Sequence, residues 1–473
     1  MKSLIIFGIL AALSVGGQCF THPSDRLLPP LEVEPSPSSH EIRTFLTRVD
    51  HFRPQDSRVT RFTYTQKADH FRVGGPIYYY INDGGLFTTV WLDQGLMHDI
   101  AMEQGALLIT SGHRYFQNNT PTASASFEDL EHLTLEQSMA DIATLISLVR
   151  SEYPYSNRVI LWGSGYGGTL AVMARQKYPH LIDGVWSSSG IFSPDVYLTD
   201  TFLHMESVIK DIGGEECGDR VREAFDEMEN MIYGGRGEEL GDMMNHCGPV
   251  NVTSDLSVAA FIQHQIEFFN QYFNVHHYNG LLQLCREIGD VNTPALDAWA
   301  DWVERTFTGF DCFNFGYYDR VELASNIEWN QPGTDNGVRQ WYYYKCTQLG
   351  LWETTSPFSD LFPHHVRDTY HYYMCNDVLG ENYDAALLFD SVEALRIIYG
   401  DINPGVTNVV YTNGEMDMWF PRGMQTSYPG GEVINIPFYA KSADLRSISE
   451  FDGAALRNAK QRIQELVTEW GQY

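Results

Sequence analysis

The chain has 473 residues, of which 43% are hydrophobic and 19% are charged, and this composition excludes an intrinsically disordered protein. Its length is sufficient for one large α/β domain with an insertion, or for two domains. The net charge of −30 argues against nucleic acid and anionic membranes as partners, because both carry charge of the same sign. A solvated acidic surface is the simplest explanation of this charge.

The first 19 residues have the pattern of a secretory signal peptide. Lys2 precedes an apolar stretch, Leu4 to Val15, that is too short to cross a bilayer, and Gly17 and Cys19 are small residues at a plausible cleavage site. Residues 20–44, with many prolines and serines, are expected to form a loose leader. We therefore expect a secreted protein, or one in the lumen of lysosome-like vesicles, with no membrane-spanning segment.

Strands and helices alternate in the part of the chain that follows. Apolar runs predict strands at 77–81, 106–110, 159–162 and 182–188, and a capped helix at 134–153. The pattern returns late in the chain with strands at 409–412 and 433–436 and a last helix over 455–470. This alternation predicts a parallel sheet with helical crossovers. We expect 45–195 and 376–473 to form one domain, and the helical segment 196–375 to cap it.

The cysteines indicate disulfide bonds in the predicted cap. Loss of Cys19 with the signal peptide leaves six of the seven cysteines, and an even number in an exported chain favours pairing. The sequence does not choose among the pairings, and none of these cysteines forms a CxxC pair. They are Cys217, Cys247, Cys285, Cys312, Cys346 and Cys375. Asn118 and Asn251 each begin an N-glycosylation sequon.

Residues 162–168 (WGSGYGG) join a predicted strand to a predicted helix, which is the setting of a nucleophile elbow. An elbow needs small residues two positions before and after its apex, and Gly163 and Gly167 satisfy this need. The apex itself is Gly165, which has no attacking atom, and Ser164 lies one residue too early. The pattern therefore predicts a turn that is retained without its nucleophile; a tight turn in an unrelated α/β protein is the alternative.

Several other stretches run in the order of one known family. They are Val49–Phe52, Gly75–Ile77, His113–Tyr115, Leu133–Gln137, the elbow with Tyr178–His180 behind it, Trp341–Gly350, Thr412–Asp417 and Ala443–Arg446. The chain resembles the serine exopeptidases that comprise prolyl carboxypeptidase, dipeptidyl peptidase II and thymus-specific serine protease. The resemblance implies an α/β-hydrolase fold with a helical cap. It also implies removal of residues next to proline from peptide ends, often in acidic compartments.

An α/β-hydrolase presents its catalytic triad in the chain order serine, acid, histidine. The resemblance places these positions on Gly165, Asp417 and Lys441. No histidine follows Asp417, because the last one in the chain is His371, so no intact triad is expected. A turn aspartate at 417 and a surface lysine at 441 are the structural alternatives.

The resemblance also implies positions for the rest of the site. The oxyanion hole would use the backbone N–H of Tyr166 and one from the Gly84-Gly85 pair, assigned to Gly85. Gly112 and Gln348 replace acidic residues of the family in stretches that line its site.

Trp341 and Trp419 are further candidates for contact with substrate, although the aromatic run that begins at Trp341 is also typical of core packing. Neither a metal nor a cofactor is expected. The adjacent histidine pairs at 276–277 and 364–365 indicate a metal only weakly, because adjacent side chains seldom converge on one ion.

These observations favour a secreted, catalytically inactive homologue, a pseudopeptidase that binds a peptide or an active relative; a second copy of the chain is a further candidate partner. One alternative is an active serine-type exopeptidase or dipeptidyl peptidase. It would use Ser164 or another nucleophile, supported by Lys441 or a displaced histidine. The other alternative is an acidic bulk secreted protein without a ligand.

Overall fold

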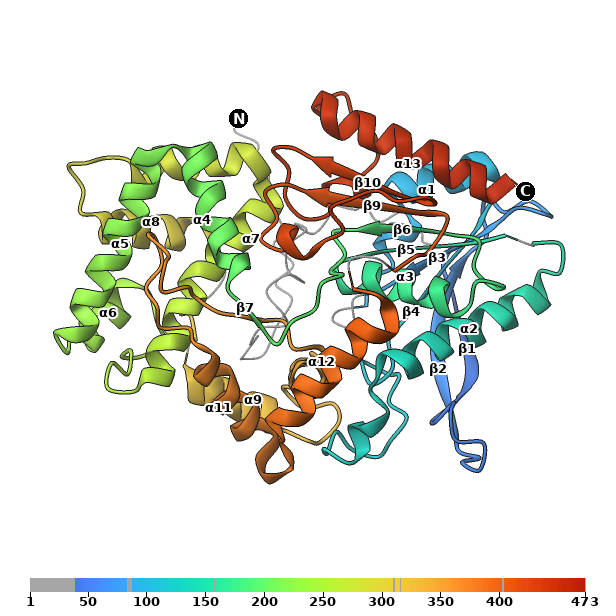
Figure 1. The fold of residues 1–473 in the computed structure, drawn as a ribbon, viewed down its shortest axis with the longest axis horizontal. Helices are drawn as coiled ribbons and strands as arrows, with labels where there is room; N and C mark the ends of the chain where they lie inside the picture. The colour runs from blue at the N-terminus through green and yellow to red at the C-terminus, as the bar shows by residue number, and fades with distance from the viewer. Residues whose placement is uncertain are drawn as a thin grey trace, which may run out of the picture.

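A computed structural model describes residues 39–82, 87–156, 158–308, 311–314, 316–401 and 404–472. Its centre is an eight-stranded sheet with the order β1-β2-β4-β3-β5-β6-β9-β10 (Figure 1). The β1–β2 and β2–β4 pairs are antiparallel and the other neighbours are parallel. The strands are β1 Glu41–Arg48, β2 Val59–Lys67, β3 Ile77–Ile81, β4 Leu107–Ser111, β5 Val159–Ser164, β6 Gly184–Ser188, β9 Val409–Gly414 and β10 Gly431–Ile436.

Helices cover both faces of this sheet. Tyr78 and Tyr80 of β3 pack with α1 (Leu96–Gln104) and α13 (Ala454–Gln472), whereas Ile77, Tyr79 and Ile81 pack with α2 (Leu135–Glu152) and α3 (Tyr166–Lys177). Successive side chains of a strand point to opposite faces, so a strand that is apolar throughout is buried on both sides. The uninterrupted apolar run of β3 is therefore explained by its place in the middle layer.

The predicted strands and helices of the sheet are present, and their ends lie within three residues of the expected ones. Thr134 caps α2 by accepting a hydrogen bond from the Gln137 N–H at 3.2 Å, as the capping pattern predicts. The expected end of the loose leader is wrong. The leader was expected to cover residues 20–44, but β1 already begins at Glu41. Here Phe45 and Thr47 turn inward while Leu46 stays exposed, which is the alternation of an antiparallel strand with one buried face.

Between β6 and β9 the chain is mainly helical, and Figure 1 shows most of these helices gathered to one side of the sheet. They are α4 Asp200–Gly213, α5 Glu215–Tyr233, α6 Gly237–Met243, α7 Asp255–Ile288, α8 Ala295–Thr306, α9 Tyr317–Ser325, α10 Val338–Tyr344, α11 Asp368–Leu379 and α12 Ala385–Tyr399. The sequence did not indicate a short parallel pair, β7 (Tyr197–Leu198) with β8 (Trp352–Glu353), which joins the start of this segment to the stretch between α10 and α11.

Three disulfides staple the helical segment: Cys217–Cys285, Cys247–Cys312 and Cys346–Cys375. They use all six cysteines expected to pair and fix the connectivity that the sequence left open. Together with the sheet order, they confirm an α/β-hydrolase fold with a disulfide-bearing helical cap.

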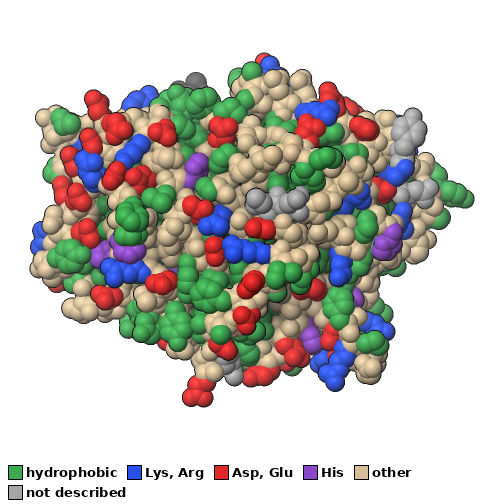
Figure 2. Space-filling model, in the orientation of Figure 1, with side chains coloured by type: hydrophobic (Ala, Val, Ile, Leu, Met, Phe, Trp, Pro, Cys, Tyr) green, Lys and Arg blue, Asp and Glu red, His purple; other side chains and the backbone are tan. Residues whose placement is uncertain are grey.

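The surface mixes both signs of charge. Figure 2 shows acidic and basic side chains interspersed over the face it presents. Among the described residues, no helix is long and apolar enough to cross a membrane. The expected signal peptide, and the leader up to residue 38, lie outside the described residues.

Candidate functional site: the cavity at the Gly165 turn

The turn between β5 and α3 consists of Gly165 alone. Its φ of 53° and ψ of −126° lie where glycine is free and a residue with a Cβ is strained. Gly163 is required by packing, since a Cβ on it would lie 2.6 Å from the carbonyl carbon of Gly167. The chain thus forms the sharp strand-to-helix turn of a nucleophile elbow, with glycine at its apex.

Backbone hydrogen bonds hold this turn against its neighbours. The Gly165 N–H donates to the Ser188 carbonyl at 2.9 Å, which ties the apex to the end of β6. The Gly165 carbonyl accepts from the N–H of Thr169 at 3.0 Å and from its hydroxyl at 3.2 Å. The turn is therefore fixed by backbone contacts that do not depend on a side chain at the apex.

Ser164 does not present its hydroxyl to the cavity. Its side chain is buried, and its hydroxyl is hydrogen-bonded to the hydroxyl of Ser442. Ser164 is not among the residues that line the cavity beside the turn. Its hydroxyl is engaged within the protein and not presented to a ligand.

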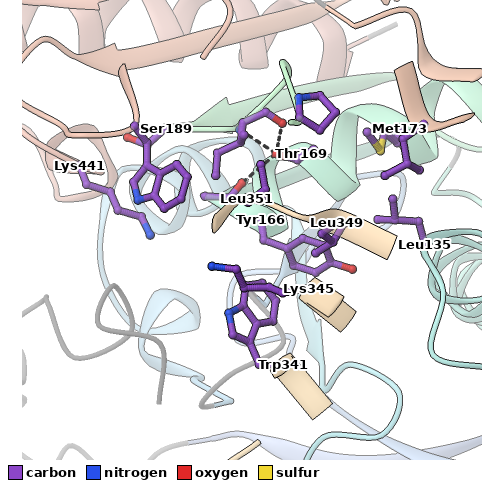
Figure 3. Close-up of a pocket in the computed structure, with 15 residues that line it drawn as sticks. Leu135, Tyr166, Thr169, Met173, Ser189, Trp341, Lys345, Leu349, Leu351 and Lys441 are labelled. Carbon is purple, nitrogen blue, oxygen red and sulfur yellow. Dashed lines mark hydrogen bonds between the residues drawn. The ribbon is translucent and has the colours of Figure 1, made fainter. Parts of the chain in front are cut away.

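A cavity opens beside the apex and is lined by Gly165, Tyr166, Thr169, Ser189, Lys345 and Lys441, together with an apolar wall (Figure 3). The cavity and its open mouth together have a volume of about 810 Å³. The apolar wall is formed by Leu135, Met173, Ile191, Pro194, Trp341, Leu349, Leu351, Leu395 and Trp419. A narrow apolar cavity with a few polar groups is the usual form of a small-ligand site.

Asp417 lies just beyond β9, next to this cavity, and is buried. One of its carboxylate oxygens accepts a hydrogen bond from the Trp419 N–H at 3.1 Å. Burial raises the pKa of Asp417 to about 6, although the positive charge of Lys441, the Trp419 N–H and the Ser189 hydroxyl oppose this rise. The acid position is therefore present, but its charge is only partly compensated.

Lys441 reaches the cavity because the cap holds its backbone. The Lys441 N–H donates to Asn274 Oδ1 at 3.1 Å, and the Ala440 N–H donates to His277 Nδ1 at 3.2 Å. His277 interrupts α7 with a φ of 51°, and this local break places its ring beside the loop at 440. Of the three expected triad positions, Gly165 and Lys441 line the cavity, whereas Asp417 is buried behind it, where it interacts with Ser189 and the charge of Lys441.

The other expected site residues divide into two groups. Trp341 and Trp419 line the cavity. Gly112 does not: it lines a separate, smaller space, and a Cβ on it would lie 2.8 Å from Asn119 Nδ2. Gln348 does not line the cavity either, because its side-chain oxygen accepts from the Leu135 N–H at 2.9 Å and so helps to cap α2.

Of the two expected oxyanion donors, Gly85 lies outside the described residues. Tyr166 is the first residue of α3 and lines the cavity. Its hydroxyl is bonded to His113 Nε2 at 3.0 Å and to the Tyr344 hydroxyl at 2.9 Å. Burial lowers the pKa of His113 to about 4, so this histidine is a neutral member of a buried network.

Sequence reasoning missed three polar residues of the cavity, which are Thr169, Ser189 and Lys345. Ser189 directly follows β6, and its position at the carboxyl end of a strand beside the elbow strand is a signal that could have found it. Lys345 lies within the matched stretch Trp341–Gly350 but carries no signal of its own. The positioning residues Asn274 and His277 are also without one, because they act over more than 160 residues of sequence.

Several of the matched stretches mainly build the scaffold, and among the three described next only Leu135 lines the cavity. Arg114 donates to both oxygens of Asp141, from Nε at 2.7 Å and from Nη2 at 3.0 Å, and His51 Nε2 lies 2.8 Å from Asp141 Oδ1. Gln137 donates to Asp50 at 2.6 Å. These contacts join the stretches at 49–52, 113–115 and 133–137 into one buried network.

The remaining expectations concern the two N-glycosylation sequons and metal binding. Asn118 and Asn251 are exposed. No group of three or more His, Cys, Asp or Glu side chains in the described ranges could hold a metal ion.

Known proteins give an independent comparison. Residues 47–463 match the family described as serine carboxypeptidase S28. The lysosomal Pro-X carboxypeptidase of Bos taurus is 25% identical over 458 residues, covering 91% of this chain and 88% of the relative. The thymus-specific serine protease of Mus musculus is 26% identical over 454 residues, covering 89% and 86%.

Among solved structures, a proline iminopeptidase of Mycobacterium smegmatis covers 86% of this chain and 94% of its own, with 12% identity and a TM-score of 0.38. The family assignment rests on the sequence match, which spans nearly all of the hydrolase fold and the cap. This chain belongs to the serine carboxypeptidase S28 family.

Proposed function

We propose that this protein is a catalytically inactive member of its family, which binds a peptide in the cavity at the Gly165 turn and does not cleave it. The observation that carries the proposal is the glycine at the elbow apex, where the attacking hydroxyl of a serine peptidase belongs. Lys441 lines the same cavity and is the residue on which the family resemblance places the base, and the Ser164 hydroxyl is bonded to Ser442. Loss of the nucleophile and base of such a triad lowers turnover by about a millionfold.

The cellular setting is part of the proposal. The signal-peptide pattern and the three disulfides favour an oxidising compartment, either outside the cell or in a lysosome-like lumen. Relatives that carry the name lysosomal Pro-X carboxypeptidase support a ligand that contains proline. The cavity favours a peptide over an active relative or a second copy of the chain as the primary partner, and it disfavours a bulk protein without a ligand.

A second candidate function keeps an enzyme, and one observation favours it. The Ser189 hydroxyl lines the same cavity as Lys441 and interacts with Asp417. Its oxygen also accepts a hydrogen bond from the Ser442 N–H at 3.0 Å. A serine between a lysine and a carboxylate could serve as a displaced nucleophile.

One experiment separates the two functions. Purified protein is incubated with fluorogenic X-Pro substrates and with a fluorophosphonate probe, at pH 5 and at pH 7, beside a heat-denatured control. We expect no stoichiometric labelling and no turnover above the control. Labelling of one serine per chain, mapped by mass spectrometry to Ser189 or Ser164, together with turnover that the corresponding alanine variant loses, would establish the second function instead.

A further inference from the structure

The cavity has a cationic end and an apolar end. Figure 3 shows the ammonium groups of Lys441 and Lys345 on one side, while Met173, Leu135 and Leu349 line the other. Gly165 contributes no side chain to the wall between them. Such a space suits a ligand that is itself divided into a charged group and an apolar group.

The two lysines differ in whether their ammonium groups form an ion pair within the protein. The Lys345 ammonium lies 3.2 Å from Glu353 Oε2 and 4.1 Å from the centre of the Trp352 ring, and its side chain is buried. Lys441 forms no ion pair with the residues that the structure describes. Lys345 is therefore a structural cation, and Lys441 is the cation that a ligand could engage.

Asp417 does not fully balance the charge of Lys441. Lys441 acts on this carboxylate only as a nearby charge, whereas the direct contacts of the carboxylate are with the Trp419 N–H and the Ser189 hydroxyl. A half-buried cation that makes no direct contact with the carboxylate leaves part of both charges uncompensated. An anionic group placed on Lys441 from the cavity side would supply the missing partner.

We propose that this cavity binds a hydrophobic carboxylate, with the carboxylate on Lys441 beside the Gly165 turn and the apolar group against Met173, Leu349 and Leu395. The proposal rests on the proposed function, because a bound acid must persist without turnover. One available cation fits a monoanion, and the apolar wall disfavours a small hydrophilic anion such as phosphate. The carboxyl terminus of a peptide with a large apolar last residue and a free fatty acid share this chemistry.

Calorimetric titration at about pH 5.5, where most of Asp417 is protonated and the ligands carry charge, tests the proposal. The probes are a tripeptide ending in phenylalanine and decanoate, each compared with its own amide. We expect each acid that binds to bind about tenfold to hundredfold more tightly than its amide, which is the value of a charge-assisted hydrogen bond. Lys441→Met should remove this difference, and Lys441→Arg should keep it.

Lys177→Met is the matched control, because Lys177 is an exposed lysine at the far end of α3. It should leave the preference for the acid unchanged. Binding of the peptide acid alone would identify a peptide terminus as the source, and binding of decanoate alone would identify a lipid-derived acid. Equal affinity for acid and amide, no binding of either acid, or an unchanged preference in folded Lys441→Met would overturn the proposal.

The comparison of acid with amide uses the unaltered protein, so it stands even if a variant fails to fold. Free phenylalanine is measured in the same samples at the end of each titration. Its release would overturn the proposed function, whereas a lost preference for acids without release would overturn only the carboxylate site.

Discussion

Two buried aspartates of the hydrolase domain, Asp141 and Asp417, differ in their partners and in the direction of their pKa shifts. Asp141 receives two hydrogen bonds from Arg114 and lies beside His51, and these partners lower its pKa despite complete burial. Asp417 is buried to a similar degree, but its nearby cation is Lys441 and burial raises its pKa to about 6. Asp141 is a paired structural acid, whereas Asp417 forms no ion pair with the residues that the structure describes.

The difference separates the scaffold from the reacting groups. The network around Asp141 joins three of the stretches that identify the family, and it stabilises the sheet against α2. The altered positions, Gly165 and Lys441, face the cavity. A scaffold of this kind can persist after the chemistry is lost, because the contacts that hold the Gly165 turn are made by the backbone.

Repair of the cavity should produce the largest effect. Gly165→Ser restores a hydroxyl at the apex and Lys441→His restores a base beside Asp417, so the double variant should react with a fluorophosphonate about a thousandfold faster than either single variant. The serine must adopt a φ near 53°, which costs about 1–3 kcal/mol of stability. Labelling rates of the folded variants measure the effect.

The matched control for the repair is Gly165→Ala with Lys441→His, which introduces the same backbone strain without a hydroxyl. It should remain unlabelled. A folded Gly165→Ser/Lys441→His variant that also remains unlabelled would show that Lys441 is not the histidine position or that the site has collapsed.

Removal of the cation from the scaffold network should cost the most stability. Arg114→Met leaves Asp141 buried without its principal partner, which should lower the free energy of unfolding by about 3–5 kcal/mol. Arg58→Met is the control, since the Arg58–Asp56 pair has an Arg side chain that is 59% exposed and should contribute little to stability. Chemical denaturation measures both. Similar losses in the two variants would contradict a special role for the buried network.

The sequence predicted the sheet because its strands have simple patterns. The central strands are apolar throughout, and β3 was placed at its observed ends. The β1–β2 hairpin was missed because β1 is half polar and follows a stretch rich in proline and serine, so its alternation was too weak to outweigh the composition. The disulfide pairing was not predictable, since it depends on how the cap helices pack.

In the candidate site, features that depend on neighbouring residues were predictable from the sequence, whereas features that depend on distant residues were not. Gly165 was found from the spacing of Gly163 and Gly167, which reflects contacts within a few residues. The orientation of Lys441 depends on Asn274 and His277 in a helix of the cap, and no local pattern reports such contacts. Gly112 and Gln348 were expected at the site, yet each is held elsewhere by a hydrogen bond to its neighbours.

Neutralising the unpaired aspartate should stabilise the protein. Because the folded-state pKa of Asp417 lies above its usual value of 3.8, the folded protein binds more protons than the unfolded chain between these values. Stability from this group therefore falls as the pH rises from about 4 to about 6, and the full penalty applies above pH 6. Asp417→Asn should raise the free energy of unfolding at pH 7 by about 3 kcal/mol and change it little at pH 4.

Asp141→Asn should change stability in the opposite direction. The pKa of Asp141 is lowered in the folded protein, so its charged carboxylate stabilises the fold. That variant should lose stability at pH 7 and lose less as the pH falls. Thermal melts of both variants across this pH range provide the measurement. A loss of stability in Asp417→Asn at pH 7 would mean that its charge is paired as well as that of Asp141.

Ser164→Ala should have the smallest effect and sharpens the distinction between a structural and a reacting hydroxyl. The Ser164 hydroxyl is buried and bonded to Ser442, so its removal should cost about 1 kcal/mol of stability, as for one buried hydrogen bond. Ser189→Ala is the matched variant, because Ser189 follows the neighbouring strand and lines the cavity. Neither change should alter fluorophosphonate labelling, which we expect to be at background. If the unaltered protein is labelled and only Ser189→Ala abolishes this, Ser189 is a displaced nucleophile; if only Ser164→Ala does so, the hydroxyl bonded to Ser442 is the reacting group.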